Sequence, residues 1–488
     1  MRLTIDGRNV EAAEGMSILQ AAKTVGIEIP TLCYLEGISD IGSCRLCVVE
    51  VEGVNELATA CNTKAKEGMV VQTASERVIE ARKTVLKLLL SNHNIDCFNC
   101  EKNGDCELQK YCNIYGIDTT PYFGSRGLLE CEIPKKDAHP FLSYDQSKCI
   151  YCQRCVQTCR VATGRRAIKL RRTGKFTIID APFGDDWEET RCESCGNCAQ
   201  ACPTGALTIK RRKNYRPWEV KRVRTTCPHC ATGCQYDLIV KDNKIVDVEG
   251  ADGPSNHKMV CVKGRSGSFD FVDHPDRVRH PLIKNKETGE FEQATWDEAL
   301  DYVAKKFTEL RDTYGGDCLA GFACARSANE DIYMLQKMVR TAFHTNNTDN
   351  CARVCHAPTV AGLATTLGSG AMTNTIADIT QDSDLIMLVG SNPEHAHPVL
   401  GMQIRRAVHK GTKLIVVDPR DIDLAHAADV HLKLTPGTNV AFANGMMNII
   451  LSEGLEDRKF IEERTENFEE MKKVVDKYPA EKVAEICH

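Results

Sequence analysis

The chain has 488 residues, of which 42% are hydrophobic and 26% are charged, and its formal net charge at pH 7 is −5. This length predicts several domains, each with a buried core, and the composition is that of a soluble globular protein. No apolar run reaches the roughly 18 residues needed to span a membrane. The first residues lack the basic and apolar segments of a signal peptide, so we expect a cytoplasmic location. The small negative charge argues against a nucleic-acid-binding function.

Cysteine is the unusual residue of this sequence. There are 26 cysteines, and they are dense in the first 261 residues and sparse afterwards. Disulfide frameworks are typical of small secreted domains, not of a long chain without a signal peptide. The distribution therefore favours metal centres placed one after another along the N-terminal half.

The first cysteine group follows a strand-like run, RLTIDG, and a helix-like run, SILQAAKTVGI. Its members are separated by 10, 2 and 13 residues, and they are Cys33, Cys44, Cys47 and Cys61. Four thiolates in a loop-rich domain fit a [2Fe–2S] cluster. The pattern resembles the β-grasp domain of respiratory complex I and of iron-only hydrogenases, which we assign to residues 1–80. A four-cysteine zinc site is the alternative, although gaps of this length are not typical of zinc.

The second group lies in HNIDCFNCEKNGDC and consists of His93, Cys97, Cys100 and Cys106. It resembles the [4Fe–4S] domain of the large complex I iron–sulfur subunit, which has one histidine and three cysteine ligands; we assign it to residues 81–140. An imidazole makes the ligand set one charge more positive and should raise the potential of the cluster. Two alternatives remain: zinc, or a bystander His93 with Cys112 as the fourth ligand.

An internal repeat with a period of 43 residues follows, within a predicted domain at 141–222. Both copies have the C-x2-C-x2-C-x3-C spacing of bacterial two-cluster ferredoxins, in which the fourth cysteine of each run serves the other cluster. Arg160 stands where proline is usual in the first run. The pattern predicts two [4Fe–4S] clusters, one held by Cys149, Cys152, Cys155 and Cys202, the other by Cys159, Cys192, Cys195 and Cys198.

A basic stretch, KRRKNYRPWEVKRVR (residues 210–224), is expected to be a linker, with nucleic-acid binding as the alternative. The next predicted domain, 223–281, contains YDLIVKDNKIVDVEG, whose period-2 alternation predicts a β-hairpin. Three cysteines precede the hairpin and one follows it, which predicts a fourth [4Fe–4S] cluster held by Cys227, Cys230, Cys234 and Cys261. In all, 19 cysteines and His93 would hold five clusters, one [2Fe–2S] and four [4Fe–4S], as a path for electrons.

Seven cysteines remain, and among them Cys355 is distinguished by its sequence context, ARVCHAPTVAG. Pro358 suits the first turn of a helix, so the sulfur is expected near a helix N-terminus. There the helix dipole and His356 would favour the thiolate, the form that binds metals. We expect most of the others to be ordinary buried thiols: Cys112, Cys131, Cys318, Cys324, Cys351 and Cys487.

The last predicted domain, 282–488, contains two apolar strand-like runs, DLIMLVGSNP and KLIVVDPRDID, with IRRAVHKG between them as the end of a crossover helix. In doubly wound α/β sheets, ligands bind at the carboxyl ends of the strands. The loops there supply candidate contacts to a guanine, ribose and phosphate: Gly390, Asn392, Asp418, Arg420, Pro436, Gly437 and Thr438. A Rossmann-like domain without a cofactor is the alternative, because no G-x-G-x-x-G is present.

Four segments, VCVKGR, ARVCHAPTVAG, GSNPEHAHP and VDPRDID, together resemble the molybdenum or tungsten bis-pterin oxidoreductases. The Cys-His pair resembles the cytoplasmic catalytic subunits of formate dehydrogenases that carry complex-I-like cluster domains; periplasmic-type nitrate reductases usually have methionine after the cysteine. The resemblance implies a bis-molybdopterin guanine dinucleotide whose metal is held by Cys355. It implies that His356 takes the proton of formate and that Lys263 lies between the nearest cluster and the pterin.

The resemblance further implies the reversible two-electron oxidation of formate to carbon dioxide. Electrons would pass to a flavin- and NAD-binding iron–sulfur subunit or to ferredoxin. The family's catalytic subunits continue for several hundred residues and include a formate-binding arginine that has no matching position here, so a separate chain completing the pterin domain is one expected partner. Two rivals remain: a non-catalytic iron–sulfur subunit like the large one of complex I, and an iron-only hydrogenase, which would share only the N-terminal domains.

Overall fold

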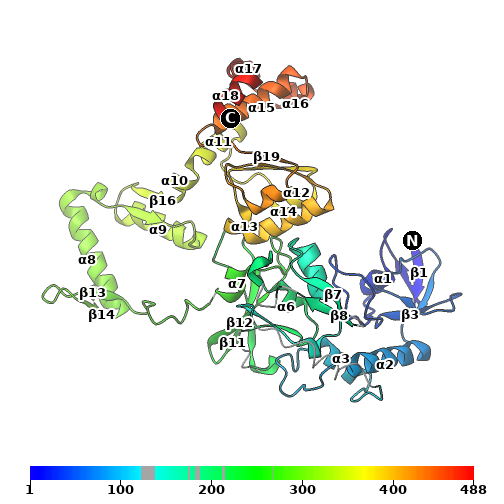
Figure 1. Cartoon of the computed structure of the whole chain (residues 1–488). Helices are drawn as coiled ribbons and strands as arrows, with labels where there is room; N and C mark the ends of the chain where they lie inside the picture. The colour runs from blue at the N-terminus through cyan, green and yellow to red at the C-terminus, as the bar shows by residue number, and fades with distance from the viewer. Residues whose placement is uncertain (123–137, 174–175, 181, 183–186, 211–214, 268) are drawn as a thin grey trace.

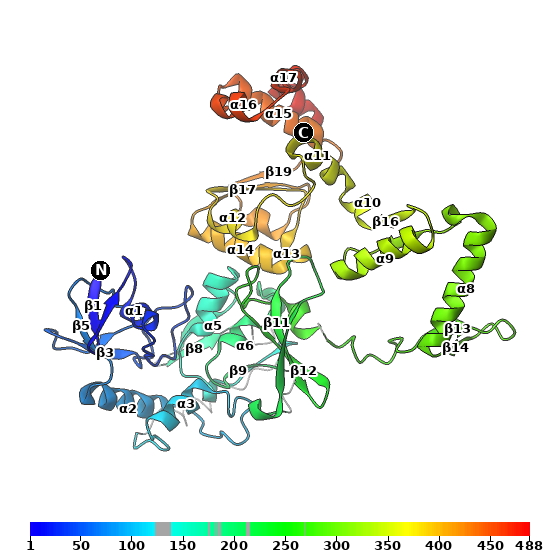
Figure 2. The same ribbon diagram turned by 180° about the vertical axis from the view of Figure 1, so that it is seen from behind.

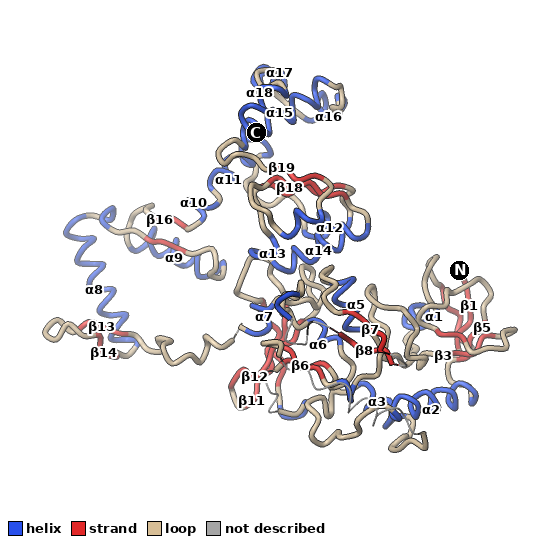
Figure 3. Tube along the Cα trace, viewed as in Figure 1, coloured by secondary structure: helices blue, strands red, loops and turns tan. Residues whose placement is uncertain are grey.

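The computed structural model describes residues 1–122, 138–173, 176–180, 182, 187–210, 215–267 and 269–488. Figures 1 and 2 show a central body flanked by the N-terminal sheet on one side, with an α/β unit above it and a separate helical arm. The tube in Figure 3 shows that loops connect short helices and strands through most of the N-terminal half. None of the described helices is long and apolar enough to cross a membrane.

The N-terminal domain is a five-stranded sheet with one helix packed on it, α1 (Ile18–Thr24). Ser17 and Gln20 form a capping box that starts this helix. Side chains from helix and sheet share one core, in which Ile5, Ile18 and Val71 are completely buried. The predicted β-grasp fold is confirmed, and its strands in spatial order are β2 (Arg8–Glu11), β1 (Arg2–Ile5), β5 (Val70–Gln72), β3 (Val48–Val51) and β4 (Ala58–Thr59).

Two helices connect this sheet to the central body, α2 (Glu76–Ser91) and α3 (Glu107–Ile114). The buried Arg82 of α2 donates to the Val48 carbonyl at 2.8 Å and to the Tyr115 hydroxyl at 3.1 Å. One guanidinium thus links the sheet, α2 and the end of α3, and its hydrogen bonds offset the cost of burying a charge.

The central body contains the two repeats. Strand β6 (Leu142–Tyr144) pairs antiparallel with β9 (Leu207–Ile209), which joins the beginning of one repeat to the end of the other. Each repeat turns into a short helix through a residue with positive φ, Gln153 in one copy and Gly196 in the other. The remaining elements are α5 (Arg154–Gln157), a π-helical turn (Thr158–Ala162), β7 (Lys169–Thr173), β8 (Phe176–Asp180) and α6 (Asn197–Ala201).

A three-stranded antiparallel sheet follows, made of β10 (Lys221–Thr226), β11 (Gln235–Lys241) and β12 (Lys244–Gly250). The predicted hairpin is confirmed, and Asp242 and Asn243 at its tip both have positive φ, as a tight two-residue turn requires. The expectation that the whole of 210–224 is a linker is wrong, because its last residues form β10, where Arg224 pairs with Asp237 at 2.6 Å. Residues 211–214 lie outside the described part.

The α/β unit has a parallel sheet of β17 (Leu385–Val389), β18 (Lys413–Val417) and β19 (Val430–Leu432). The predicted crossover helix is α14 (Pro398–Lys410), whose Ile404 and Ala407 are buried together with Leu414 and Val416 of β18. The doubly wound α/β class is therefore confirmed. Short helices precede and follow β17, namely α12 (Ile376–Gln381) and α13 (Pro393–Ala396), whereas α7 (Val262–Ser266) belongs to the preceding domain.

A second parallel pair, β15 (Gly321–Ala323) with β16 (Thr348–Asn350), lies in the arm, away from the main sheet. The long helix α8 (Trp296–Tyr314) has no buried residue although its sequence is amphipathic, and Leu300, Val303 and Leu310 are exposed. The arm consists of the hairpin β13 (Leu282–Lys284) and β14 (Phe291–Gln293), then α8, α9 (Asn329–Ala342), α10 (Ala352–Cys355) and α11 (Ala357–Leu367).

The C-terminal segment is divided into several helices. Asn467, with φ of 60°, and Pro479 stand immediately before two of them and interrupt the helical path. These helices pack on the carboxyl side of the main sheet through Phe442 and Cys487. They are α15 (Asn439–Ser452), α16 (Arg458–Arg464), α17 (Phe468–Val475) and α18 (Ala480–Cys487).

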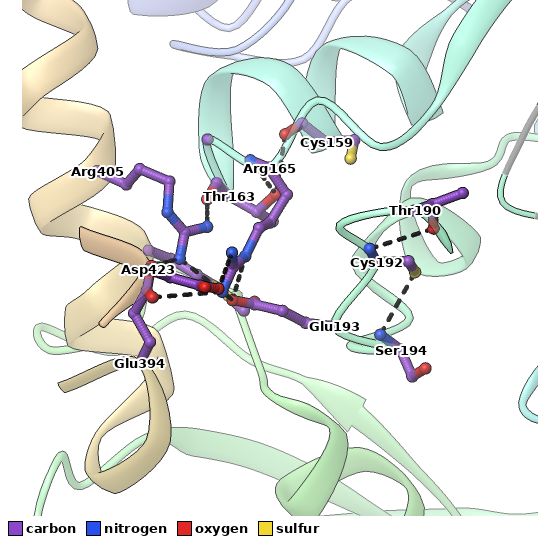
Figure 4. Close-up of polar contacts among 12 residues, drawn as sticks. Cys159, Thr163, Arg165, Thr190, Cys192, Glu193, Ser194, Glu394, Arg405 and Asp423 are labelled. Carbon is purple, nitrogen blue, oxygen red and sulfur yellow. Dashed lines mark hydrogen bonds and ion pairs between the residues drawn. The ribbon is translucent and has the colours of Figure 1, made fainter. Parts of the chain in front are cut away.

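A network of charged side chains joins the central body to the α/β unit (Figure 4). Arg405 of α14 pairs with Glu394 of α13 and, at 3.2 Å, with Glu193 of the second repeat. Arg165 pairs with Glu193 as well, and with Asp423 at 2.7 Å. The side chains of Glu394 and Arg405 are only 1% and 8% exposed, so each depends on the other for neutralisation.

We expect Arg405→Met to destabilise this junction, because it leaves the buried Glu394 carboxylate with only the 3.5 Å contact to Arg165. Removing one partner of a buried pair costs about 3 kcal/mol. The thermal unfolding midpoint should fall and trypsin should cut between the two units sooner. Arg2→Met is the control, because Arg2 pairs with Glu11 on the surface and contributes little. Equal midpoints for both variants would contradict the role of Arg405.

Candidate iron–sulfur and cofactor sites

The first cysteine group converges in one buried pocket. Cys33 contacts the thiols of Cys44 and Cys61, and Cys47 contacts Cys61. The hydrogen bonds from Cys44 and Cys61 lower the pKa of Cys33 to about 2, while the same contacts raise the pKa values of Cys44 and Cys61. The Leu32 N–H donates to the Cys44 sulfur at 3.4 Å. Mutual thiol contact with a backbone donor is the environment that thiolate ligands of a cluster need.

The loop that carries these ligands needs a glycine at position 42. Gly42 has φ of 65°, and a Cβ built on it would lie 2.7 Å from the side-chain nitrogen of Asn62. Thr59 Oγ1 holds Asn62 Oδ1 at 2.5 Å, so the asparagine has little room to move. The close approach brings the loop before Cys44 against the loop of Cys61, which gathers ligands that lie far apart in the sequence.

In the second group the three cysteines lie near one another around the start of α3. Burial raises the pKa of Cys106 to about 11, with smaller effects from Cys97 and Cys100. Burial likewise raises the pKa of Cys112 to about 11, and Cys106 and Cys97 again contribute. The structure thus places Cys112 beside the same thiols, while His93 is buried just after the end of α2. Ligation by His93 stays a prediction, with Cys112 as the alternative.

In the repeats, the thiols that influence one another belong to different runs. Burial and then the nearby Cys202 raise the pKa of Cys152, and Cys149 also contributes. In the other copy, burial raises the pKa of Cys195 to about 12, with contributions from Cys159 and Cys192. The fourth cysteine of each run therefore lies beside the first three of the other run, as expected for the two-cluster ferredoxin fold.

Backbone N–H groups point at several of these sulfurs. Tyr151 donates to Cys149 at 3.4 Å, Ser194 to Cys192 at 3.4 Å, and Ala167 to Cys159 at 3.2 Å. Such donors stabilise thiolates and are a feature of iron–sulfur ligand loops. Tyr151 and Ser194 occupy equivalent positions in the two repeats, and both have positive φ, 54° and 55°.

The fifth group consists of Cys227, Cys230, Cys234 and Cys261, which line one small pocket together with Lys263 and Val399. The Cys227 N–H donates to the Cys234 carbonyl at 2.9 Å, and Cys261 directly precedes helix α7. Lys263 donates from Nζ to the His395 carbonyl at 3.3 Å. This lysine therefore lies between the fifth group and the GSNPEHAHP loop.

Among the residues that the structure describes, no three His, Cys, Asp or Glu side chains are close enough to hold a single metal ion. An iron–sulfur core fits the donor chemistry of these groups, because their donors are almost entirely sulfur and several accept backbone N–H groups.

The carboxyl ends of the main sheet meet at one edge. The Gly390 N–H donates to the Val417 carbonyl at 2.8 Å, which places the loop after β17 against the loop after β18. Asp418 is 1% exposed, and both its oxygens accept from Arg420, which lowers the pKa of Asp418. Asn392 Oδ1 is buried and accepts no hydrogen bond from any described residue.

This edge fits a nucleotide. An orphaned buried acceptor is costly unless a ligand donates to it, and guanine or ribose can do so at Asn392. The third loop contains Gly437, with φ of 93°, and Thr438, which precedes α15 and donates to the Thr435 carbonyl at 2.7 Å. Pro436 lies beside them, so the candidate residues form three neighbouring loops at the ends of β17, β18 and β19.

Cys355 lies at the carboxyl end of the other parallel pair. It ends the short helix α10, which follows β16, and His356 directly precedes α11. Pro358 is in the first turn of α11, as predicted. Cys355 is exposed and His356 half-buried in this chain. The main sheet and the β15–β16 pair are separate sheets, so the structure does not join Cys355 to the nucleotide loops by strand pairing.

Sequence reasoning missed two buried residues beside the repeats. Burial lowers the pKa of His139, which is completely buried, to about 4; its Nε2 lies 3.6 Å from the Cys192 sulfur. Arg265, 4% exposed, donates from Nε to the Cys195 carbonyl at 2.8 Å. Arg265 lies within the VCVKGR segment and could have been noticed there, whereas His139 has no spacing relation to the cysteines. Cys131 lies outside the described residues.

Comparisons with known proteins agree along the chain. The matching families are the 2Fe-2S iron-sulfur cluster binding domain (residues 1–76), the NADH-ubiquinone oxidoreductase-G iron-sulfur binding region (82–121), the ferredoxin-like domain of NADH-quinone oxidoreductase subunit 3 (139–208), the molybdopterin oxidoreductase Fe4S4 domain (220–272) and molybdopterin oxidoreductase (277–477).

Three curated relatives align over nearly the whole chain. The alpha subunit of the NADPH-Fe(3+) oxidoreductase of Geobacter sulfurreducens is 35% identical over 96% of this chain and 54% of its own length. YjgC of Bacillus subtilis, provisionally named an oxidoreductase, is 32% identical over 98% of this chain and 52% of its own length. A Staphylococcus aureus protein provisionally named a formate dehydrogenase is 30% identical over 98% of this chain and 52% of its own length.

The chain thus spans about half the length of the curated relatives it matches. The matched domains follow the order in which the cysteine groups and the main sheet lie along the chain. Residues 277–477 match the molybdopterin oxidoreductases, and the residues before them match iron–sulfur domains of the NADH-quinone oxidoreductase type.

Proposed function

We propose that this chain is part of the catalytic subunit of a formate dehydrogenase, an enzyme that removes two electrons and a proton from formate and releases carbon dioxide. The observation that carries the proposal is the Cys355–His356 pair, placed between the carboxyl end of β16 and the first turn of α11. Chain segments at the carboxyl ends of parallel strands are the usual ligand positions of this architecture. The name of the Staphylococcus aureus relative supports the substrate.

The residues have separate roles in this proposal. Cys355 would hold molybdenum or tungsten, and the bis-pterin centre would supply two-electron chemistry while the clusters carry single electrons. His356 is adjacent to that sulfur and would accept the proton that formate loses when its C–H bond breaks. Lys263, whose ammonium is already fixed on the His395 carbonyl, would donate to the pterin and supply positive charge.

The nucleotide part of the cofactor would bind at the main sheet. Asn392 Oδ1 would accept from guanine or ribose, and Gly390 and Gly437, which lack side chains, would let backbone approach the phosphates. Asp418 is held in place by Arg420 and would accept from a hydroxyl or an amine. Pro436 and Thr438 would line the nucleotide site from the third loop, at the end of β19.

The cluster ligands would be those predicted from the sequence, in domains at residues 1–80, 81–140, 141–222, 223–281 and 282–488. We further propose a cytoplasmic complex with a flavin- and NAD-binding subunit, or with ferredoxin as acceptor. The exposed apolar side chains of the arm, among them Leu300 and Met334, suit burial against a further protein surface.

A second candidate is a non-catalytic electron-transfer subunit like the large iron–sulfur subunit of complex I. The exposure of Cys355 in this chain favours it, because a metal-binding thiolate normally lies in a closed pocket. The two candidates differ in whether the assembled complex contains molybdenum or tungsten.

Metal content separates these candidates. We expect the purified complex to contain one molybdenum or tungsten per chain in addition to iron, and Cys355→Ser to lose that metal while iron is unchanged. Cys318→Ser is the control, because Cys318 is also an exposed thiol but lies far from the pair in sequence. Elemental analysis of both variants measures this, and iron alone in the unmodified complex would exclude the catalytic proposal.

For the proton step, we expect His356→Ala to lower kcat for formate oxidation by about 10²–10⁴-fold, the contribution typical of a general base. Iron, molybdenum and tungsten contents should not change. His274→Ala, a substitution of an exposed histidine beside Asp276, should leave kcat unchanged. Steady-state assays of the whole complex measure kcat for each variant. An unchanged kcat in the His356→Ala variant would show that His356 does not accept the proton.

A further inference from the structure

The two ferredoxin-like cysteine sets have unequal surroundings although the repeats that supply them are near-copies. We name Cys149, Cys152, Cys155 and Cys202 the first set, and Cys159, Cys192, Cys195 and Cys198 the second set. Each set receives backbone N–H groups at equivalent positions, from Tyr151 and Ser194. The differences arise from residues outside the repeats.

His139 adds a side-chain donor to the second set. Its Nδ1 accepts the N–H groups of Phe141 at 3.1 Å and Leu142 at 3.0 Å, so the ring proton must be on Nε2. Nε2 lies 3.6 Å from the Cys192 sulfur and 3.4 Å from the Ser194 hydroxyl. The imidazole is therefore fixed by the backbone with its N–H directed at a cluster ligand.

Arg265 adds a positive charge. Its guanidinium donates to the Cys195 carbonyl at 2.8 Å, to Asn197 Oδ1 at 3.1 Å and to Gln200 Oε1 at 2.7 Å, all of which are neutral acceptors. Among the described residues, no carboxylate forms an ion pair with it. A buried cation without a partner carboxylate is costly, so the negative charge of a cluster at Cys195 and Cys198 is its natural counterion.

The packing fixes this arginine against the second set. A Cβ built on Gly196 would lie 2.5 Å from Arg265 Cδ, so the arginine occupies the space that a side chain at 196 would need. Arg265 also follows Cys261 by four residues and its N–H donates to the Cys261 carbonyl at 3.0 Å. The residue therefore spans from the fifth cysteine group to the second set.

Two other charged side chains next to the sets, Glu193 and Arg154, form ion pairs. Glu193, next to Cys192, is paired with Arg165 and Arg405. Arg154, the buried cation beside the first set, is paired with Glu107 at 2.6 Å. Arg265 thus differs from Arg154, because no carboxylate in the described part lies at ion-pair distance from its guanidinium.

We propose that His139 and Arg265 are positioning residues that raise the reduction potential of the second-set cluster above that of the first-set cluster. Hydrogen bonds to the sulfurs and net charge both set such potentials, and both contributions favour the reduced, more negative form. The second set then holds the electron between the pterin side and the N-terminal clusters. The inference rests on the proposed cluster assignments, and it is independent of the substrate.

The test is a redox titration of the purified complex, followed by EPR with a chemical reductant and no formate. A Cys195→Ser variant identifies the signal of the second-set cluster. Arg265→Gln should shift the reduction equilibrium of that signal about tenfold towards the oxidised form, which is 59 mV for a one-electron couple. His139→Phe should shift the same signal in the same direction, and Arg265→Lys, which keeps the charge, should shift it less.

Arg224→Gln is the matched control, because Arg224 pairs with Asp237 on an exposed strand and should move neither signal. If Arg265→Gln loses iron, the comparison of Arg265→Lys and His139→Phe with the unmodified complex decides. The proposal is overturned if the second-set signal has the lower potential in the unmodified complex, or if neither His139→Phe nor an iron-retaining Arg265 variant moves it. The titration contains no formate, so its result does not depend on whether the complex oxidises formate.

Discussion

The structure depends on bringing buried sulfur atoms together. Thiols packed side by side, such as Cys33, Cys44 and Cys61, cannot all ionise without a cation, so their mutual contacts displace one another's pKa values in opposite directions. A metal core resolves this conflict and binds the loops that supply the ligands. The small cores of these domains are consistent with such cross-links, because short loops and few strands bury little apolar surface.

The cysteine sets also define how the domains meet. Leu32 and Cys44 of the first domain share a buried cluster with Leu108 and Cys152, which come from two later domains. Cys227 and Cys261 share another with Val399 of the α/β unit. Ligand loops are therefore placed at domain junctions, and the first of these two junctions brings cysteines of different groups close. Short separations of this kind are what single-electron transfer through a protein requires.

The fold could be predicted well where local patterns determine it. The hairpin at 236–250, the crossover helix ending at Lys410 and the strands after Asp384 and Thr412 follow directly from hydrophobic periodicity. Strand β10 was missed because its charged side chains, Lys221, Arg222 and Arg224, concealed the alternation of an edge strand.

The candidate site was predictable only in part, for a related reason. Cysteine spacing reveals ligands, because the geometry of a loop around a cluster constrains the sequence locally. His139 and Arg265 reach the second set from 53 and 70 residues away, so no local pattern reports them. The buried pair of Glu394 and Arg405 could be recognised as a pair only in three dimensions, although Glu394 lies within a quoted segment.

Gly196 makes the ferredoxin-like domain and the domain that follows it depend on each other's sequence. Its missing side chain leaves the volume in which an arginine from the neighbouring domain lies. A ferredoxin module transplanted from another protein with alanine at this point would push that arginine away, even if every cysteine were retained. Exchange of such modules during evolution would thus have to carry the glycine along, or replace the arginine at the same time.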